Sequence, residues 1–237
     1  MVWGLQEPSS FGMYYPNGEY VGWKDRLEAY WRNEMSEEEK TRIEANHPSD
    51  YISYVTRKFS GEIGTQIRHH GFFELTPLLP HECPDEFRTE NNMREIGALM
   101  LGLGLIVSEP LKALIEGLEP GVHLFWPLRI TGQRGSGYPG CYYGMQVRRH
   151  LDSFCPELSV TGCFTKSDST SLDWYYSRGD TKPSYAGLAM SESVIDDAHI
   201  WYERRLRDPR LFISDTLQAE IRRAGLKVWK HNKMKSV

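Results

Sequence analysis

The sequence predicts an α+β fold with a mainly antiparallel sheet, two units in which a strand leads into a serine-capped helix and a further strand, and a helical extension at the N-terminus. Strand-like segments cluster between residues 105 and 189, helical patterns lie at the start, middle and end of the chain, and one strand–helix–strand pattern occurs twice. We expect residues 1–90 to form the N-terminal irregular and helical extension. Residues 91–237 then form the main α+β domain.

Composition narrows the class of protein. The chain has 237 residues, of which 40% are hydrophobic and 25% are charged, and these values suit a globular protein with a sizeable core. A net charge of −4 gives no basic excess, so we expect no nucleic-acid partner. No stretch approaches the length of a membrane helix, and the N-terminus lacks the pattern of a secretory signal. We therefore expect a cytoplasmic protein without a membrane partner, whose cysteines are free thiols: Cys83, Cys141, Cys155 and Cys163.

Two helices are expected near the N-terminus. Residues 27–31 place apolar side chains at i, i+3 and i+4, which gives one apolar helix face. Ser36 and Glu39 have the spacing of a capping box, so a second helix begins there, and Pro48 ends it.

The next segment divides into a loop and a third helix. Residues 75–84 contain three prolines, which predict a surface loop. Residues 91–101 have a pattern that we interpret as helical.

The clearest strand signal spans residues 122–130, where apolar and other residues alternate. Pro127 cannot donate a backbone hydrogen bond, so this strand should lie at an edge or carry a bulge. A glycine-rich connection follows, and residues 141–147 should pair back as a hairpin. Further strands are expected at 158–164 and 172–177.

An internal repeat links two distant parts of the chain. Residues 105–115 and 211–221 each contain three apolar residues, a serine, an acidic residue and then apolar residues at helical spacing. A buried strand that leads into a helix explains both, because Ser108 or Ser214 can cap the first turn. Each helix ends before a glycine, at Gly121 or Gly225, and a β-like run follows.

Motifs of catalysis and of metal binding are incomplete. No G-x-S-x-G elbow, P-loop or dinucleotide fingerprint is present. Residues 69–70 are adjacent histidines that would point to opposite faces of a strand, and His81 with Cys83 lacks a second ligand pair. We expect no catalytic residue, no cofactor and no metal. A nucleophilic cysteine beside a histidine is the pairing that stays open, from Cys155 or Cys163 with His150 or His199.

The C-terminal two-thirds, residues 92–234, resembles a family of predicted immunity (antitoxin) proteins from bacterial polymorphic-toxin systems. That family shows an apolar strand that ends in serine before a short helix, a strand of Phe-x-Pro-apolar type, and near its end an aromatic strand, a second apolar–serine–helix unit and a glycine. The matching residues here are Val107–Ser108, Leu111, Phe125–Leu128, Ile200–Trp201, Phe212–Ser214, Leu217 and Gly225.

The resemblance implies a protein that binds and neutralises a cognate toxin as a stoichiometric heterodimer and catalyses no reaction. The alternatives are a small cytosolic hydrolase or modification-reversing enzyme whose site is not visible in the sequence, and a scaffold protein without a toxin. For a binding protein we look for aromatic and charged surface residues. The candidate partner-binding residues are Arg134 and Tyr138 in the hairpin loop and Trp174, Tyr175 and Arg178 in the later strand, with residues 204–210 as a further patch.

Overall fold

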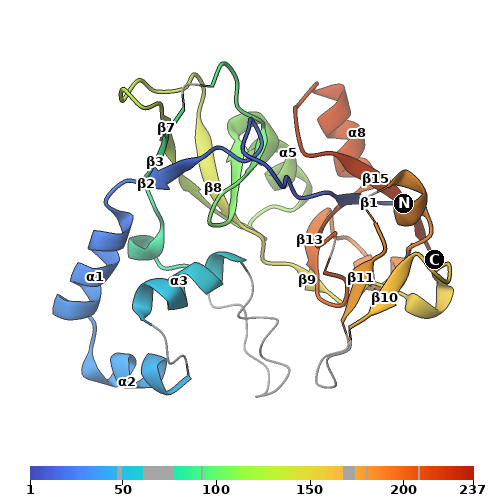
Figure 1. The fold of residues 1–237 in the computed structure, drawn as a ribbon, viewed down its shortest axis with the longest axis horizontal. Helices are drawn as coiled ribbons and strands as arrows, with labels where there is room; N and C mark the ends of the chain where they lie inside the picture. Colours follow the sequence, from blue (N-terminus) through green and yellow to red (C-terminus); the bar gives the residue numbers. More distant parts are fainter. Residues whose placement is uncertain (47–49, 61–76, 92, 168–173, 180, 208) are drawn as a thin grey trace.

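Helices and mostly antiparallel strands make up the chain, which confirms the predicted α+β class (Figure 1). The computed structural model describes all residues except 47–49, 61–76, 92, 168–173, 180 and 208. Two larger sheets form the body, and a lobe of helices projects from one side of it (Figure 1). Within the described part of the chain, no helix has the length and apolar character needed to cross a membrane.

A six-stranded sheet joins the two ends of the chain. The N-terminal strand β1 lies between β14 and β15 and is antiparallel to both, with Val2 opposite Ser214 on one side and Met234 on the other. The outer pairings, β12 with β15 and β13 with β9, are parallel. In spatial order the strands are β12 (Ala189–Met190), β15 (His231–Ser236), β1 (Val2–Leu5), β14 (Leu211–Ser214), β13 (Ile200–Glu203) and β9 (His150–Leu151).

A four-stranded antiparallel sheet contains the predicted hairpin. β6 pairs with β8, which confirms the pairing expected between the two segments, and β6 lies at the sheet edge as Pro127 requires. Gly144 of β8 faces Trp126 of β6, and a Cβ at this glycine would lie 2.0 Å from the indole ring, so only glycine fits. In spatial order the strands are β4 (Leu99–Leu101), β5 (Leu105–Ser108), β8 (Tyr142–Gln146) and β6 (Leu124–Pro127).

The internal repeat is structural. In one copy β4 and β5 form a hairpin, helix α5 (Glu109–Leu118) follows, and β6 returns to the sheet with β8 between β5 and β6. In the other copy β13 and β14 form a hairpin, helix α8 (Asp215–Arg223) follows, and β15 returns with β1 between β14 and β15. Both copies therefore have four strands in the same spatial order. In each copy one strand from elsewhere in the chain, β8 or β1, lies antiparallel between the strand before the helix and the strand after it.

The two helices of the repeat pack into one hydrophobic core. Leu111 and Ile115 of α5 and Leu217 and Ile221 of α8 are buried together with residues of both large sheets. This shared core holds the two copies of the repeat together.

The serine caps of these helices differ. Ser214 Oγ accepts a hydrogen bond from the Leu217 amide at 3.1 Å, as predicted. Ser108 occupies the corresponding position, but its side chain makes no cap bond, so that part of the prediction is wrong. Gly121 and Gly225 both follow their helices with positive φ, as a helix-terminating glycine does.

Two small sheets and several short elements complete the body. β2 is antiparallel to β3, β3 is parallel to β7, and β10 is antiparallel to β11. The strands are β2 (Gly18–Tyr20), β3 (Glu86–Thr89), β7 (Arg129–Thr131), β10 (Phe164–Lys166) and β11 (Tyr175–Ser177). The short helical elements are η3 (Pro156–Leu158), α6 (Lys182–Ala186) and α7 (Glu192–Ile195).

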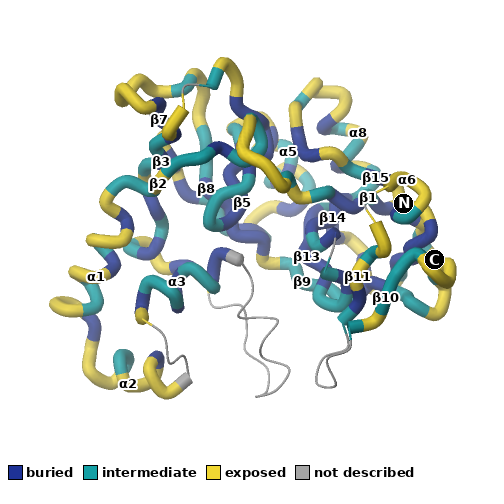
Figure 2. Tube along the Cα trace, viewed as in Figure 1, coloured by how far each residue is buried: buried dark blue, intermediate teal, exposed yellow. Residues whose placement is uncertain are grey.

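The N-terminal lobe has its own apolar core. Both predicted helices are present, and the Glu39 amide donates to Ser36 Oγ at 3.2 Å, which confirms the cap at the start of the second. The core contains Trp23, Leu27 and Val55, and the outer surfaces of the first two helices are largely exposed (Figure 2). The lobe consists of α1 (Trp23–Asn33), α2 (Glu37–Asn46), α3 (Tyr51–Ser60) and the short turn η2 (Pro80–Glu82).

Two predicted elements are wrong. Residues 91–101 do not form the predicted helix, because β4 occupies Leu99–Leu101 as a strand buried on both faces, whose apolar run cannot be distinguished from a helix by periodicity. Residues 158–164 are mostly a turn, in which Leu158 and Val160 are 51% and 60% exposed, and β10 begins only at its last residue.

Two further predictions need correction. The strand expected over residues 122–130 is divided at Leu128, and its halves, β6 and β7, join different sheets. The proline-rich segment 75–84 is not a simple surface loop over its described part, because Leu78 and Glu82 are 5% and 0% exposed and belong to the interior of the lobe.

The strand expected at 172–177 is confirmed over Tyr175–Ser177, and its first residues lie outside the described part.

Candidate functional site

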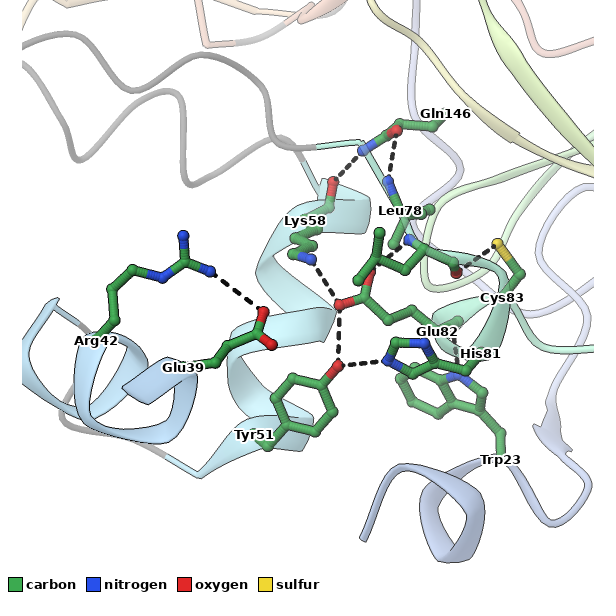
Figure 3. Close-up of polar contacts among 11 residues, drawn as sticks. Trp23, Glu39, Arg42, Tyr51, Lys58, Leu78, His81, Glu82, Cys83 and Gln146 are labelled. Carbon is green, nitrogen blue, oxygen red and sulfur yellow. Dashed lines mark hydrogen bonds and ion pairs between the residues drawn. The ribbon is translucent and has the colours of Figure 1, made fainter. Parts of the chain in front are cut away.

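A buried ion pair lies at the centre of the N-terminal lobe (Figure 3). Lys58 Nζ of α3 is 2.5 Å from Glu82 Oε1, and the two side chains are 3% and 1% exposed. Tyr51 donates its hydroxyl to the same carboxylate oxygen at 3.1 Å, and the Leu79 amide donates to the other oxygen at 2.7 Å. Each carboxylate oxygen thus has a donor, which is the condition for burying a charge.

His81 connects this ion pair to the lobe surface. Its Nε2 is 2.8 Å from the Tyr51 hydroxyl oxygen, and because that hydroxyl donates to Glu82, the imidazole N–H donates to Tyr51. The imidazole also stacks on the Tyr30 ring with 3.6 Å between centroids. Burial lowers the pKa of His81 below its ordinary value, and the imidazole is therefore neutral near pH 7.

The lobe is fastened to the four-stranded sheet. Gln146 of β8 donates from its amide to the Lys58 carbonyl at 3.2 Å and accepts from the Leu78 amide at 3.3 Å (Figure 3). Trp23 of α1 donates its indole N–H to the Glu82 carbonyl at 2.7 Å. These bonds fix α1, α3 and η2 relative to one another and to the body.

Four rings form an aromatic face on the lobe, which we define as Tyr30, Trp31, Tyr51 and His81. Trp31 stacks on Tyr51 with 5.5 Å between centroids and 26° between planes. Tyr30 stacks on Tyr51 and on His81, with 6.2 and 3.6 Å between centroids. Tyr51 is buried, whereas Tyr30, Trp31 and His81 are half-buried and present part of each ring to solvent. Half-buried, stacked rings are typical of protein-binding surfaces, where rigid aromatic side chains act as anchors.

A groove of about 540 Å³ lies at the other end of α1. β2 borders it, and this strand is at the edge of its sheet. The walls combine aromatic rings with charged side chains, and Phe11 on the rim is 62% exposed. The principal lining residues are Phe11, Tyr15, Glu19, Tyr20, Lys24 and Phe87.

The first pair of predicted partner-binding residues, Arg134 and Tyr138, lies in the loop after β7. Arg134 is exposed. Tyr138 is half-buried, and its hydroxyl accepts from the Met93 amide at 2.8 Å, so it supports the loop internally. Of this pair, Arg134 is therefore the more exposed residue.

The second group lies at β11, on the opposite side of the molecule from β7 (Figure 1). Tyr175 is 8% exposed and packs in a core, while Trp174 is half-buried beneath the Arg207 guanidinium, 3.4 Å from its ring centroid. Arg178 is exposed and donates to Thr165 Oγ1 at 3.0 Å. The structure therefore does not bring the two predicted groups together.

The cysteine–histidine pairings that the sequence leaves open are not formed in the structure. His150 donates from Nε2 to the Val147 carbonyl at 3.2 Å, and His199 Nδ1 is 2.7 Å from Ser214 Oγ, so each imidazole has a partner other than a cysteine. Burial raises the pKa of Cys155, which disfavours its thiolate. All four cysteines are free.

No metal site is formed by the residues that the structure describes, since no group of three or more His, Cys, Asp or Glu side chains is placed to hold an ion. His69 and His70, considered as ligands above, lie outside the described residues.

Two other buried clusters join separate elements. Glu119 accepts from the His123 imidazole and from the Ile200 amide, each at 3.0 Å, and pairs with Arg149 at 2.6 Å. Glu203 accepts from the Ser153 amide and hydroxyl at 2.8 and 2.7 Å. Both carboxylates are almost fully buried, and their partners come from different strands and loops, which is the arrangement of structural crosslinks.

Comparison with known proteins identifies the family. The model of the immunity protein family (Imm11) matches residues 14–236. The chain belongs to this immunity protein family. The match begins well before residue 92, where the resemblance in the sequence was first visible, so the family pattern includes the N-terminal lobe. No curated protein matches the chain.

The sequence analysis did not predict the network of Lys58, Glu82 and Tyr51 in the N-terminal lobe of this immunity protein. Tyr51, Val55, Lys58 and Phe59 fall at the spacing of one helix face, and this signal predicts α3 as an amphipathic helix. Nothing in the sequence indicates that Lys58 pairs with Glu82, because the partners lie 24 residues apart on different elements.

Proposed function

We propose that this immunity protein acts in the cytoplasm by binding a cognate toxin as a stoichiometric heterodimer and thereby neutralising it. The observation that carries the proposal is the family match, which extends over nearly the whole chain from residue 14 to residue 236. A protein that works by binding needs a stable scaffold and an exposed surface with a few anchoring side chains.

The structure supplies such a scaffold. The buried polar groups around Glu82, Glu119 and Glu203 hold elements together and are enclosed by the protein, so they serve the fold rather than a substrate. The exposed aromatic and charged side chains are what remain for recognition of a partner. Arg134 and Arg178 are the two predicted contact residues that are exposed, and we propose them as contacts on separate patches.

The test is neutralisation in a cell. The gene for this protein and the gene of a candidate toxin, taken from the same locus, are placed under separate inducers in a sensitive bacterium. We expect the toxin alone to stop growth and co-expression of this protein to restore it, with a 1:1 complex in gel filtration. Growth arrest that persists although the immunity protein is folded and abundant, for every toxin encoded at the locus, would overturn the proposal.

A titration with purified proteins separates binding from catalysis. A stoichiometric inhibitor protects only while it is at least equimolar with the toxin. An enzyme protects at a small fraction of the toxin concentration, because each molecule turns over many times. Titration of the purified toxin's activity against the immunity protein should therefore reach full inhibition near a ratio of one.

A further inference from the structure

The aromatic face of the lobe lies beside an acidic segment of the chain. Residues 34–46 contain five glutamates against one lysine and one arginine, which is a net charge of −3, while the whole chain carries −4. Glu34 ends α1 directly after the aromatic rings, and Glu39 lies in the first turn of α2. Burial first, and then the charges of Glu39, Glu34 and Glu82, raise the pKa of Tyr30, so these carboxylates lie near this ring.

Several of these carboxylates have no internal partner. Glu37 pairs with Lys40 at 2.6 Å, and Glu39 pairs with Arg42 at 3.2 Å. Glu34, Glu38 and Glu44 are exposed, and no cation of the described residues lies at ion-pairing distance from them. The Glu34 charge is therefore available to a partner, whereas half-buried Glu39 has its ion pair with Arg42 in the free protein.

We propose that the acidic–aromatic surface, defined as the aromatic face together with Glu34 and Glu39, is where this protein binds its toxin, and that it receives a basic, arginine-bearing surface of the toxin. The inference rests on the proposed function, and it adds the contact surface and the charge of the partner.

Arginine fits this surface better than other side chains do. Its planar guanidinium stacks on aromatic rings and forms paired hydrogen bonds with a carboxylate, and here both groups lie together. The protein contains an internal example of such stacking, since the Arg207 guanidinium lies 3.4 Å from the Trp174 ring centroid. An acidic surface also attracts a basic partner over a distance and accelerates association.

The rings are held in place before a partner arrives. His81 is fixed by Tyr51, Tyr51 is fixed by Glu82, and Glu82 is fixed by Lys58, so the stack extends from a rigid ion pair (Figure 3). A preorganised surface loses little conformational entropy on binding. This gives the buried network a role in recognition although none of its charges reaches the partner.

The experiment compares two isosteric double variants. Glu34→Gln/Glu39→Gln removes the two carboxylates beside the rings, and Glu7→Gln/Glu157→Gln removes two exposed carboxylates elsewhere. Binding to the toxin identified by the neutralisation experiment is measured by calorimetry and by stopped-flow association at low and high salt. We expect the first variant to bind about tenfold more weakly, with slower and less salt-dependent association, and the second to stay within about twofold of the parent protein.

A second variant tests the rings. Trp31→Ala should weaken binding by about 30-fold or more, because half-buried tryptophans are frequent anchors. Far-UV circular dichroism and the melting temperature establish that the lobe is still folded. If Trp31→Ala does not fold, the isosteric glutamate variants decide the question alone.

The outcomes separate this inference from the proposed function. If the parent protein binds the toxin and both double variants bind equally well, the acidic–aromatic surface is not the contact. The same conclusion follows if Arg134→Glu/Arg178→Glu abolishes binding while Glu34→Gln/Glu39→Gln does not. If the parent protein binds no toxin, the proposed function itself fails, and this inference fails with it.

Discussion

Lys58 and Glu82 form an ion pair in the interior of the N-terminal lobe, with 2.5 Å between Nζ and Oε1. The two residues enter from α3 and from η2, and the same carboxylate accepts from Tyr51 and from the Leu79 amide. Three separate donors therefore depend on one buried carboxylate. The lobe should be the part of the protein most sensitive to changes at these two positions.

Lys58→Met is expected to destabilise the protein strongly, because it leaves the Glu82 carboxylate buried without its cation. Removal of one partner of a buried pair costs about 3–5 kcal/mol. Lys58→Met/Glu82→Gln should recover part of this loss, since no charge is then left unpaired. The free energy of unfolding in urea is the measurement. Lys40→Met, which breaks the more exposed pair with Glu37, is the control and should have only a small effect.

The two serines of the repeat should respond differently to the same substitution. Ser214→Ala removes a bond to the Leu217 amide and a contact with His199, and we expect a loss of about 0.5–2 kcal/mol. Ser108→Ala removes no hydrogen bond formed by the described residues and should be close to neutral. Thermal and denaturant unfolding of both variants test this pair, and equal losses would contradict it.

His150 should make stability rise with pH in mildly acidic solution. Burial lowers its pKa to about 4 from the ordinary value of 6.5. Between these values the unfolded chain binds a proton that the folded protein does not, so the stabilisation is complete above pH 6.5 and is lost as the pH falls towards 4. His150→Gln should remove this part of the pH dependence. Unfolding free energies at pH 5 and pH 7 for both proteins provide the measurement.

Glu203 should make stability fall, rather than rise, with increasing pH in mildly acidic solution. Burial raises its pKa to about 7, so between pH 4.5 and pH 7 the folded protein keeps a proton that the unfolded chain has lost. This carboxyl therefore stabilises the fold least above pH 7. Relative to the parent protein, Glu203→Gln should gain stability as the pH rises from 5 to 8. Parallel stability curves for the two proteins would show that Glu203 does not titrate in this range.

The repeat and the hairpin could be predicted from the sequence because each produces a local residue pattern. The pattern around Ser108 and Ser214 predicts both strand–helix units, and the alternation before Pro127 predicts an edge strand. The division of that strand between two sheets could not be predicted from the sequence. Its halves keep the same alternation, and only the tertiary partners of β6 and β7 differ.

The candidate contact surface is harder to predict from the sequence. Residues 27–31 and the acidic run after Ser36 were visible in the sequence as helix signals. Their combination into one surface depends on His81, which reaches the rings from a proline-rich turn more than 40 residues further along the chain. Such contacts between distant segments have no counterpart in the local pattern, and periodicity does not report them.

The position of β1 has a consequence for synthesis. The first copy of the repeat takes its middle strand, β8, from residues that follow directly, so its sheet can form from one continuous segment as the chain leaves the ribosome. The second copy takes its middle strand from Val2–Leu5 and completes it with His231–Ser236. At about 5–20 residues per second, strand β1 waits roughly 10–45 s for its last neighbour. A chain that stops before β15 therefore leaves one edge of β1 unpaired and open to proteases.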